Sequence, residues 1–157
     1  MSVEEGKKAP DFTAATDGGK KLKLSELRGK PVVLYFYPKD DTSGCTKQAC
    51  GFRDNLAAFN RAKAHVLGIS RDSVASHDKF KKKYGLTFPL VFDEDGKVVE
   101  AYGCWVEKSM YGRNYMGIDR STFLIDGTGT VRKVWRKVKV PGHVEEVLAA
   151  ARGLGEA

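Results

Sequence analysis

The chain has 157 residues, which suits one ordinary domain with a single sizeable core and leaves too little for two full domains. Hydrophobic residues make up 41% and charged residues 30%, both near the globular average, which argues against disordered, collagen-like and coiled-coil proteins. The net charge of +7 favours anionic partners without identifying one. We therefore expect a single domain spanning residues 1–157.

The location of the protein is inferred from what the chain lacks. No apolar run approaches the roughly 20 residues that a membrane helix needs, and residues 1–8 are polar and unlike a signal peptide. Three cysteines are an odd number and too few for a disulfide scaffold. We expect a cytoplasmic protein without membrane association, whose cysteines are buried thiols, metal ligands or redox catalysts.

The first third of the chain predicts a hairpin, a strand and a helix. Turn formers at residues 17–19 separate two short extended stretches, and residues 25–29 predict one capped helical turn. Residues 32–37 have the composition of a strand buried on both faces, and Pro38 ends it. After a loop of turn formers, apolar residues recur at helical spacing between residues 49 and 59, which predicts one helix.

The same alternation continues along the rest of the chain. Residues 66–70 predict a second buried strand, and residues 73–84 a polar helix that Gly85 ends. Residues 88–92 predict a third strand, which its proline places at a sheet edge. The remaining elements are a short helix near residues 97–102, a hairpin of residues 121–125 and 130–138, and an amphipathic helix around residues 144–151. This order predicts an α/β fold with a central mixed β-sheet flanked by helices and an N-terminal hairpin.

Cys45 is the first candidate for chemistry. It lies where a buried strand has ended and a helix begins, the usual place for catalytic groups in an open α/β sheet. A thiol in the first helical turn meets unpaired backbone N–H groups and the positive end of the helix dipole, which stabilise a thiolate. Cys45 is therefore a candidate nucleophile, and the alternative is an inert thiol between helix and sheet.

Cys50 lies five residues further along the same expected helix. Five helical residues separate Cα atoms by roughly 8 to 9 Å, beyond the roughly 7 Å that a disulfide spans. A disulfide with Cys45 would therefore require the first turns to unwind, and it would couple redox state to local unfolding. The alternative for Cys50 is simple packing beside Ala49.

Several motifs resemble one known family. Pro38, Thr42 and Cys45 match the Pro-x-x-x-Thr-x-x-Cys motif of the peroxiredoxins. Three stretches resemble the bacterioferritin comigratory protein subfamily, also called PrxQ: residues 9–12, 44–54 and 111–126. The resemblance covers nearly the whole chain. It implies a thioredoxin-like fold and a thiol-dependent peroxidase for hydrogen peroxide and organic hydroperoxides, active in antioxidant defence.

The resemblance also implies roles for five residues. Cys45 would be the peroxidatic cysteine, which attacks the peroxide as a thiolate and becomes a sulfenic acid. Thr42 would hydrogen-bond the thiolate and the peroxide, Arg120 would stabilise the thiolate and the charge on the O–O bond, and Pro38 would shield the site. Cys50 would be the resolving cysteine, forming an intramolecular disulfide that thioredoxin or another dithiol protein reduces. No metal, haem or flavin is implied, and a monomer is favoured.

Each assignment has a simpler alternative. Thr42 could be only a helix cap, Arg120 a surface ion-pair partner and Pro38 a strand terminator. Cys104 is expected to be a packed thiol, with a resolving role as the alternative. The whole protein could also be a thiol redox sensor or holdase that uses the same cysteine switch.

Two positions depart from the subfamily. Ser43 stands where proline is common, which loosens the loop, and Gln48 stands where glutamate is common, which removes an anionic partner for a nearby arginine. Some relatives carry the resolving cysteine in their second helix, but residues 73–84 contain none, which strengthens the case for Cys50.

The remaining candidates are weaker. His65 at a strand start, His77 on a polar helix face and His143 at a helix start lack metal-ligand spacing, so no metal site is expected. The lysines within residues 79–83 predict a solvated helix face rather than a nucleic-acid site, because stacking aromatics and a known motif are missing. Five large side chains predict core or loop packing, or a wall of the peroxide pocket: Trp105, Met110, Tyr111, Tyr115 and Met116.

Overall fold

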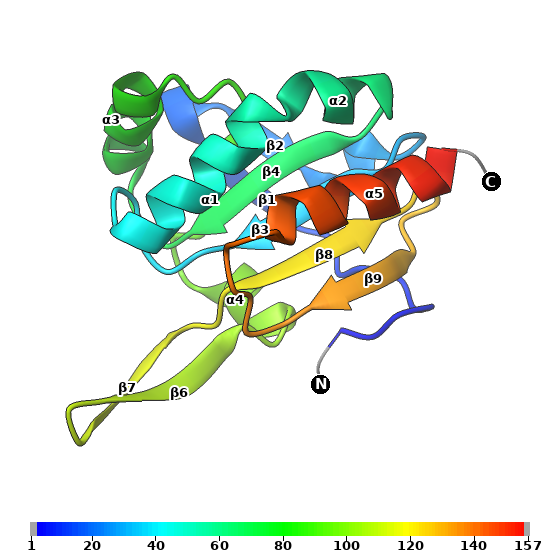
Figure 1. Ribbon diagram of the computed structural model, residues 1–157. Coiled ribbons are helices and arrows are strands. Elements are labelled where there is room, and N and C mark those ends of the chain that lie inside the picture. Colours follow the sequence, from blue (N-terminus) through cyan, green and yellow to red (C-terminus); the bar gives the residue numbers. More distant parts are fainter. Residues whose placement is uncertain (1–2, 156–157) are drawn as a thin grey trace.

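The computed structural model describes residues 3–155 and is built around a seven-stranded mixed sheet (Figure 1). The strand order is β2-β1-β5-β4-β3-β8-β9. The strands are β1 (Thr13–Thr16), β2 (Lys21–Lys23), β3 (Val32–Phe36), β4 (His65–Ser70), β5 (Leu90–Phe92), β8 (Ser121–Ile125) and β9 (Val131–Trp135). A second sheet pairs β6 (Trp105–Met110) with β7 (Arg113–Ile118).

Helices cover both faces of the large sheet. The helices are α1 (Ser43–Asp54), α2 (Leu56–Arg61), α3 (Val74–Tyr84), α4 (Lys97–Ala101) and α5 (His143–Gly155), with short 3₁₀ turns η1 (Asp17–Gly19) and η2 (Leu24–Leu27). One core packs α1, α2, α3 and α5 on one face, and a second core packs α4 and the N-terminal segment on the other. Figure 1 shows α1, α2 and α5 above the sheet and α4 below it.

Strand β3 contributes to both cores, as its composition predicts. It pairs parallel with β4 and antiparallel with β8, and all of its residues are buried. Val33 and Tyr35 face the core under α1, whereas Leu34 and Phe36 face the opposite core. The strand therefore delivers the chain, at its carboxyl end, to the start of α1.

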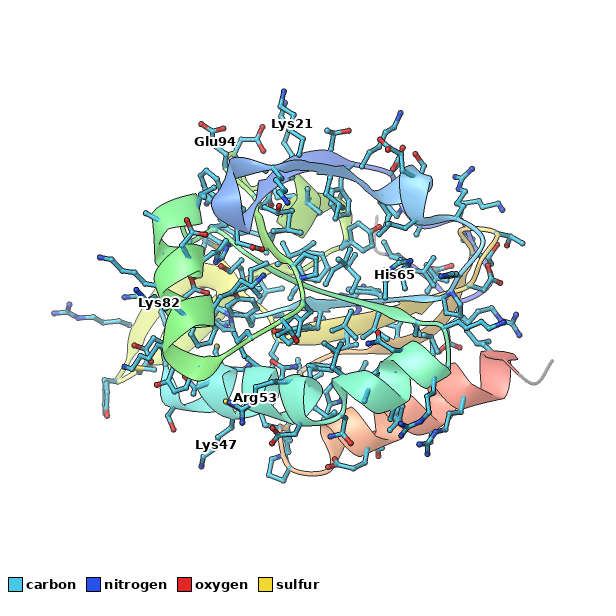
Figure 2. All side chains as sticks on the ribbon, turned by 90° about the horizontal axis from the view of Figure 1, so that it is seen from above. Lys21, Lys47, Arg53, His65, Lys82 and Glu94 are labelled. Atoms are coloured by element: carbon cyan, nitrogen blue, oxygen red, sulfur yellow. The ribbon has the colours of Figure 1, made fainter. Side chains whose placement is uncertain are left out.

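Most of the elements expected from the sequence are present. The N-terminal hairpin, β4, α4, the β8–β9 hairpin and α5 all form close to their expected bounds. Helix α3 is capped as expected, because the Ser73 side chain accepts a hydrogen bond from the Ser76 amide and Gly85 adopts a left-handed conformation. Its lysine-rich side faces solvent, as Lys82 does in Figure 2, although Lys81 is half-buried and pairs with Asp17.

Two predicted elements differ in the structure. The expected single helix over residues 49–59 is divided into α1 and α2 at Asn55, whose side chain donates to the Gly51 carbonyl at 2.8 Å. Apolar periodicity continues across the break because both helices pack on the same core. Strand β5 lies between β4 and β1 rather than at an edge. Pro89 precedes the strand and supplies only its carbonyl, which accepts from Gly68, so the missing N–H costs no ladder bond.

The β6–β7 hairpin corrects a third expectation. It projects from the body as a two-stranded arm (Figure 1). Four side chains expected in core or loop packing are exposed on it: Met110 (55%), Tyr111 (99%), Tyr115 (44%) and Met116 (49%). A two-stranded ribbon without a covering layer cannot bury its two faces. Within residues 3–155, no helix combines the length and apolarity needed to cross a membrane.

Candidate active site

Cys45 occupies the first turn of α1, directly after the loop that follows β3. The backbone N–H of Tyr37 continues the sheet by donating to Ile69, and half-buried Pro38 then turns the chain away. Helix α1 begins at Ser43, so the Cys45 thiol lies among the unpaired N–H groups of a twelve-residue helix. Its side chain is buried, with the residue only 1% exposed. The thiol is therefore shielded from solvent and lies at the positive end of the helix dipole.

Arg120 lies directly over this thiol. It belongs to the link between β7 and β8, and its Nη2 donates to Cys45 Sγ at 3.2 Å. Its Nη1 donates to Gln48 Oε1 at 2.7 Å, so the guanidinium spans one turn of α1. Gly44 leaves room for this approach, since a Cβ there would lie 3.1 Å from Nη2. No carboxylate of residues 3–155 lies within ion-pair distance of Arg120, so the alternative of a surface ion pair is wrong.

Thr42 is the N-cap residue of α1 by position but not by side chain. Its hydroxyl makes no capping bond and instead donates to the Lys39 carbonyl at 2.9 Å. The alternative of a side-chain helix cap is therefore wrong. Because its proton is directed into the loop, the Thr42 oxygen can still accept a hydrogen bond through its lone pairs.

Cys50 lies half-buried in the same unbroken helix as Cys45, and both are free thiols. The intact helix keeps the two sulfurs apart, as the spacing predicts. The next residue is packed tightly against α5, because a Cβ at Gly51 would come within 3.0 Å of Val144. The amino-terminal part of α1 is thus held by Arg120 and its later part by α5.

Comparison with known proteins places this chain in a family. A family model described as the AhpC/TSA family matches residues 5–134. The peroxiredoxin Bcp of Bacillus subtilis (strain 168) is 49% identical over 156 residues, which cover 99% of each chain. The chain belongs to the AhpC/TSA family and, within it, to the Bcp/PrxQ peroxiredoxins. It is a thiol peroxidase, and the expected resemblance is confirmed.

Solved structures of Bcp/PrxQ peroxiredoxins share its fold. A cysteine-to-serine variant of PrxQ from Xylella fastidiosa superposes with a TM-score of 0.92 at 41% identity and covers 98% of each chain. The bacterioferritin comigratory protein of Xanthomonas campestris, studied for alkyl peroxide reduction, gives a TM-score of 0.88 at 45% identity and covers 92% of each chain. The thioredoxin-like fold of this peroxiredoxin is therefore confirmed.

Cys104 lies in the core on the other side of the sheet from Cys45. It is fully buried, and its Sγ lies 3.6 Å from the Tyr102 carbonyl oxygen. Burial above all raises the pKa of the Cys104 thiol to about 11, which keeps it protonated and unreactive at neutral pH. The expectation of a packed thiol is confirmed.

One group of site residues escaped the sequence analysis. Asp40, in the loop between β3 and α1, is nearly buried, and its Oδ2 lies 2.8 Å from His77 Nδ1. The expectation that His77 lies on a polar helix face is wrong, because its side chain is fully buried. The signal was its spacing, since His77 precedes buried Phe80 by three residues and so shares its side of α3. No cluster that could hold a metal ion occurs in the part of the chain that the structure describes.

Proposed function

We propose that Cys45 is the peroxidatic cysteine of this enzyme and that hydrogen peroxide and organic hydroperoxides are its substrates. The observation that carries the proposal is the 3.2 Å contact of Arg120 with the thiol at the start of a helix. The thiolate attacks one peroxide oxygen, an S–O bond forms and the O–O bond breaks. The leaving oxygen takes a proton and departs as water or an alcohol, while the sulfur is oxidised to sulfenic acid.

Arg120 and Thr42 support this step in different ways. The Arg120 guanidinium stabilises the thiolate and then the negative charge that grows on the leaving oxygen. The Thr42 hydroxyl accepts from the peroxide O–H and so orients the O–O bond toward the sulfur. Half-buried Pro38 limits water access beside them.

We propose Cys50 as the resolving cysteine. Its thiol condenses with the Cys45 sulfenic acid, so that an S–S bond forms and water leaves. Because both residues lie in α1, the first turns must unwind before the sulfurs can meet. A dithiol protein such as thioredoxin then supplies two electrons to reopen the disulfide. We propose that the enzyme is a monomer, as its resemblance to the subfamily favours, and that it works in the cytoplasm.

Peroxide-dependent oxidation of NADPH, coupled through thioredoxin reductase and thioredoxin, tests these roles. Cys45→Ser is expected to abolish turnover, because a serine hydroxyl is hardly ionised at neutral pH. Cys50→Ser is expected to react once and then stop, with its sulfenic acid passing to sulfinic acid at excess peroxide.

Cys104→Ser serves as the matched control and is expected to cycle like the wild type. Appreciable turnover without Cys45 contradicts the peroxidatic role. Full cycling without Cys50 transfers the resolving role to another thiol. Slow turnover with a persistent disulfide in the wild type supports a redox sensor instead.

A further inference from the structure

Helix α3 holds the loop that precedes the peroxidatic cysteine. Two consecutive aspartates of that loop contact α3, one near its beginning and one at its end. Asp41 is exposed, and its carboxylate accepts from Tyr84 Oη at 2.7 Å and Lys83 Nζ at 2.8 Å. Asp40 points inward, where its Oδ2 accepts from Ser76 Oγ and meets His77 Nδ1, both at 2.8 Å. Figures 1 and 2 both show α3 at the same end of the molecule as the beginning of α1.

The hydrogen bonds of His77 determine how many protons the buried pair holds. His77 Nε2 lies 3.0 Å from the Val91 carbonyl oxygen, which can only accept, so Nε2 carries a hydrogen. The contact between Nδ1 and Asp40 then needs one more proton, either on the imidazole or on the carboxyl group. Without that proton, two lone pairs would face each other at 2.8 Å in a site closed to water. The contact therefore exists only while the pair holds this proton.

The groups around the pair offer no substitute for the proton between Nδ1 and Oδ2. From the end of β3, Tyr37 Oη donates to Asp40 Oδ1 and lies 3.5 Å from His77 Nδ1, so its single proton is directed to the carboxylate rather than to the ring. Burial above all raises the pKa of this phenol far beyond its ordinary value. From the β4–α3 turn, the Asp72 carboxylate accepts from the Asp40 backbone N–H at 2.8 Å. Tyr35 on β3 is also fully buried and close enough for Asp40 to raise its phenol pKa further. No lysine or arginine of residues 3–155 pairs with Asp40.

We infer that Asp40 and His77 form a proton-dependent clamp that positions the peroxidatic loop. The inference rests on the proposed role of Cys45. While the pair holds its proton, residues 38–42 are fixed against α3, and Thr42 and the first turn of α1 keep their places. When the proton is lost, the contact breaks, the loop loosens and the reaction with peroxide slows. Both are positioning residues, since neither touches the thiol.

Rapid-mixing measurements of the single reaction of Cys45 with hydrogen peroxide, between pH 5 and 10, test the clamp. Asp40→Ala removes it, and the rate at neutral pH is expected to fall about tenfold or more because the reacting groups are misplaced. Asp40→Asn retains most of the rate, because its amide N–H can donate to neutral His77 without a titrating proton. The wild type is expected to slow at the alkaline end, whereas Asp40→Asn stays level once the thiolate has formed.

A second measurement reads the proton itself. In nitrogen NMR spectra of the wild type, His77 Nδ1 is expected to show the signal of a nitrogen that shares a proton with Asp40. In Asp40→Asn, Nδ1 is expected to lack this proton, whereas Nε2 keeps its own. Asp41→Asn is the matched control, because it removes only the exposed ion pair and is expected to leave the pH profile unchanged.

Equal losses in Asp40→Ala and Asp40→Asn would overturn the clamp, and so would superimposable alkaline profiles for the wild type and Asp40→Asn. Thermal unfolding of each variant shows that the protein compared is folded. Cys45→Ser separates the two proposals. Peroxide reduction that survives in this variant contradicts the role of Cys45 as the nucleophile. If Cys45→Ser is inactive but the Asp40 variants react with peroxide like the wild type, only the clamp is contradicted.

Discussion

The Arg120 side chain has two acceptors of different charge. One is the Cys45 sulfur and the other is the neutral amide oxygen of Gln48. A guanidinium matches two acceptors at once because its N–H groups point along parallel directions. With a neutral amide as the second acceptor, the positive charge of Arg120 remains available to the thiolate.

Gln48→Glu tests this division of charge. The new carboxylate would pair with Arg120 and lie one helical turn from the thiolate, which would make the anionic sulfur less favourable. We expect the reaction with hydrogen peroxide at neutral pH to slow by about threefold to tenfold, which is on the scale of one charged hydrogen bond. The onset of Cys45 alkylation by iodoacetamide should move to higher pH. Gln48→Met is the uncharged control, and an alkylation profile of Gln48→Glu that matches it would contradict the argument.

At this scale, the sequence predicted the residues whose signal is local. The position of Cys45 at a helix start and the spacing of Gln48 behind it follow from helical geometry. Arg120 lies 75 residues from Cys45, so only the family resemblance could connect them. The burial of His77 was missed because polar residues flank it and lysines follow it in the sequence, although Phe80 marks its side of the helix.

Among the elements, α1 is the one that must change during the reaction. Its beginning is held by Arg120, and its later part packs against α5 through Gly51 and Val144. It ends at Asn55 rather than continuing into α2. The segment that must unwind to join Cys45 to Cys50 is therefore short and has a packed boundary on its C-terminal side.

Hydrogen exchange followed by mass spectrometry tests this localised unwinding. Oxidation of the wild type with one equivalent of peroxide is expected to speed amide exchange across residues 46–53, because the disulfide cannot form on an intact helix. Peptides from α3 and α5 should exchange as before. Oxidised Cys50→Ser, which cannot form the disulfide, is the control and should resemble the reduced protein. A mapped disulfide between Cys45 and Cys50 without faster exchange would show that the helix need not open.

The elements that the sequence did not predict are those whose environment is set by distant partners. The position of β5 inside the sheet depends on β1 joining its far side, which no local pattern around Pro89 reveals. On the β6–β7 arm, Met110 and Tyr115 are exposed, although apolar side chains of this kind predict a buried segment when only the sequence is considered. Composition and periodicity predict burial only where another layer covers the element.

Across the whole molecule, α5 is joined to the sheet by a buried polar contact. His143, only 4% exposed, lies with its Nε2 2.8 Å from the hydroxyl of Thr122 on β8. Its ring also meets Trp135 of β9 edge to face. Burial above all lowers the pKa of His143 to about 4, and the nearby charge of Arg120 lowers it further. His143 is therefore neutral in the folded protein at neutral pH.

This depressed pKa predicts how stability depends on pH. Between pH 4 and the ordinary histidine value near 6.5, the unfolded chain binds a proton at His143 that the folded protein does not, so stability rises with pH there. Protonation of His143 does not reduce the free energy of unfolding at pH values well above 6.5. About 3 kcal/mol of that free energy is lost as the pH falls to 4. His143→Gln keeps a hydrogen-bonding group beside Thr122 without a titrating ring. Urea unfolding between pH 4 and 7 should therefore give a shallower pH dependence for this variant than for the wild type, and parallel curves would mean that His143 is protonated alike in both states.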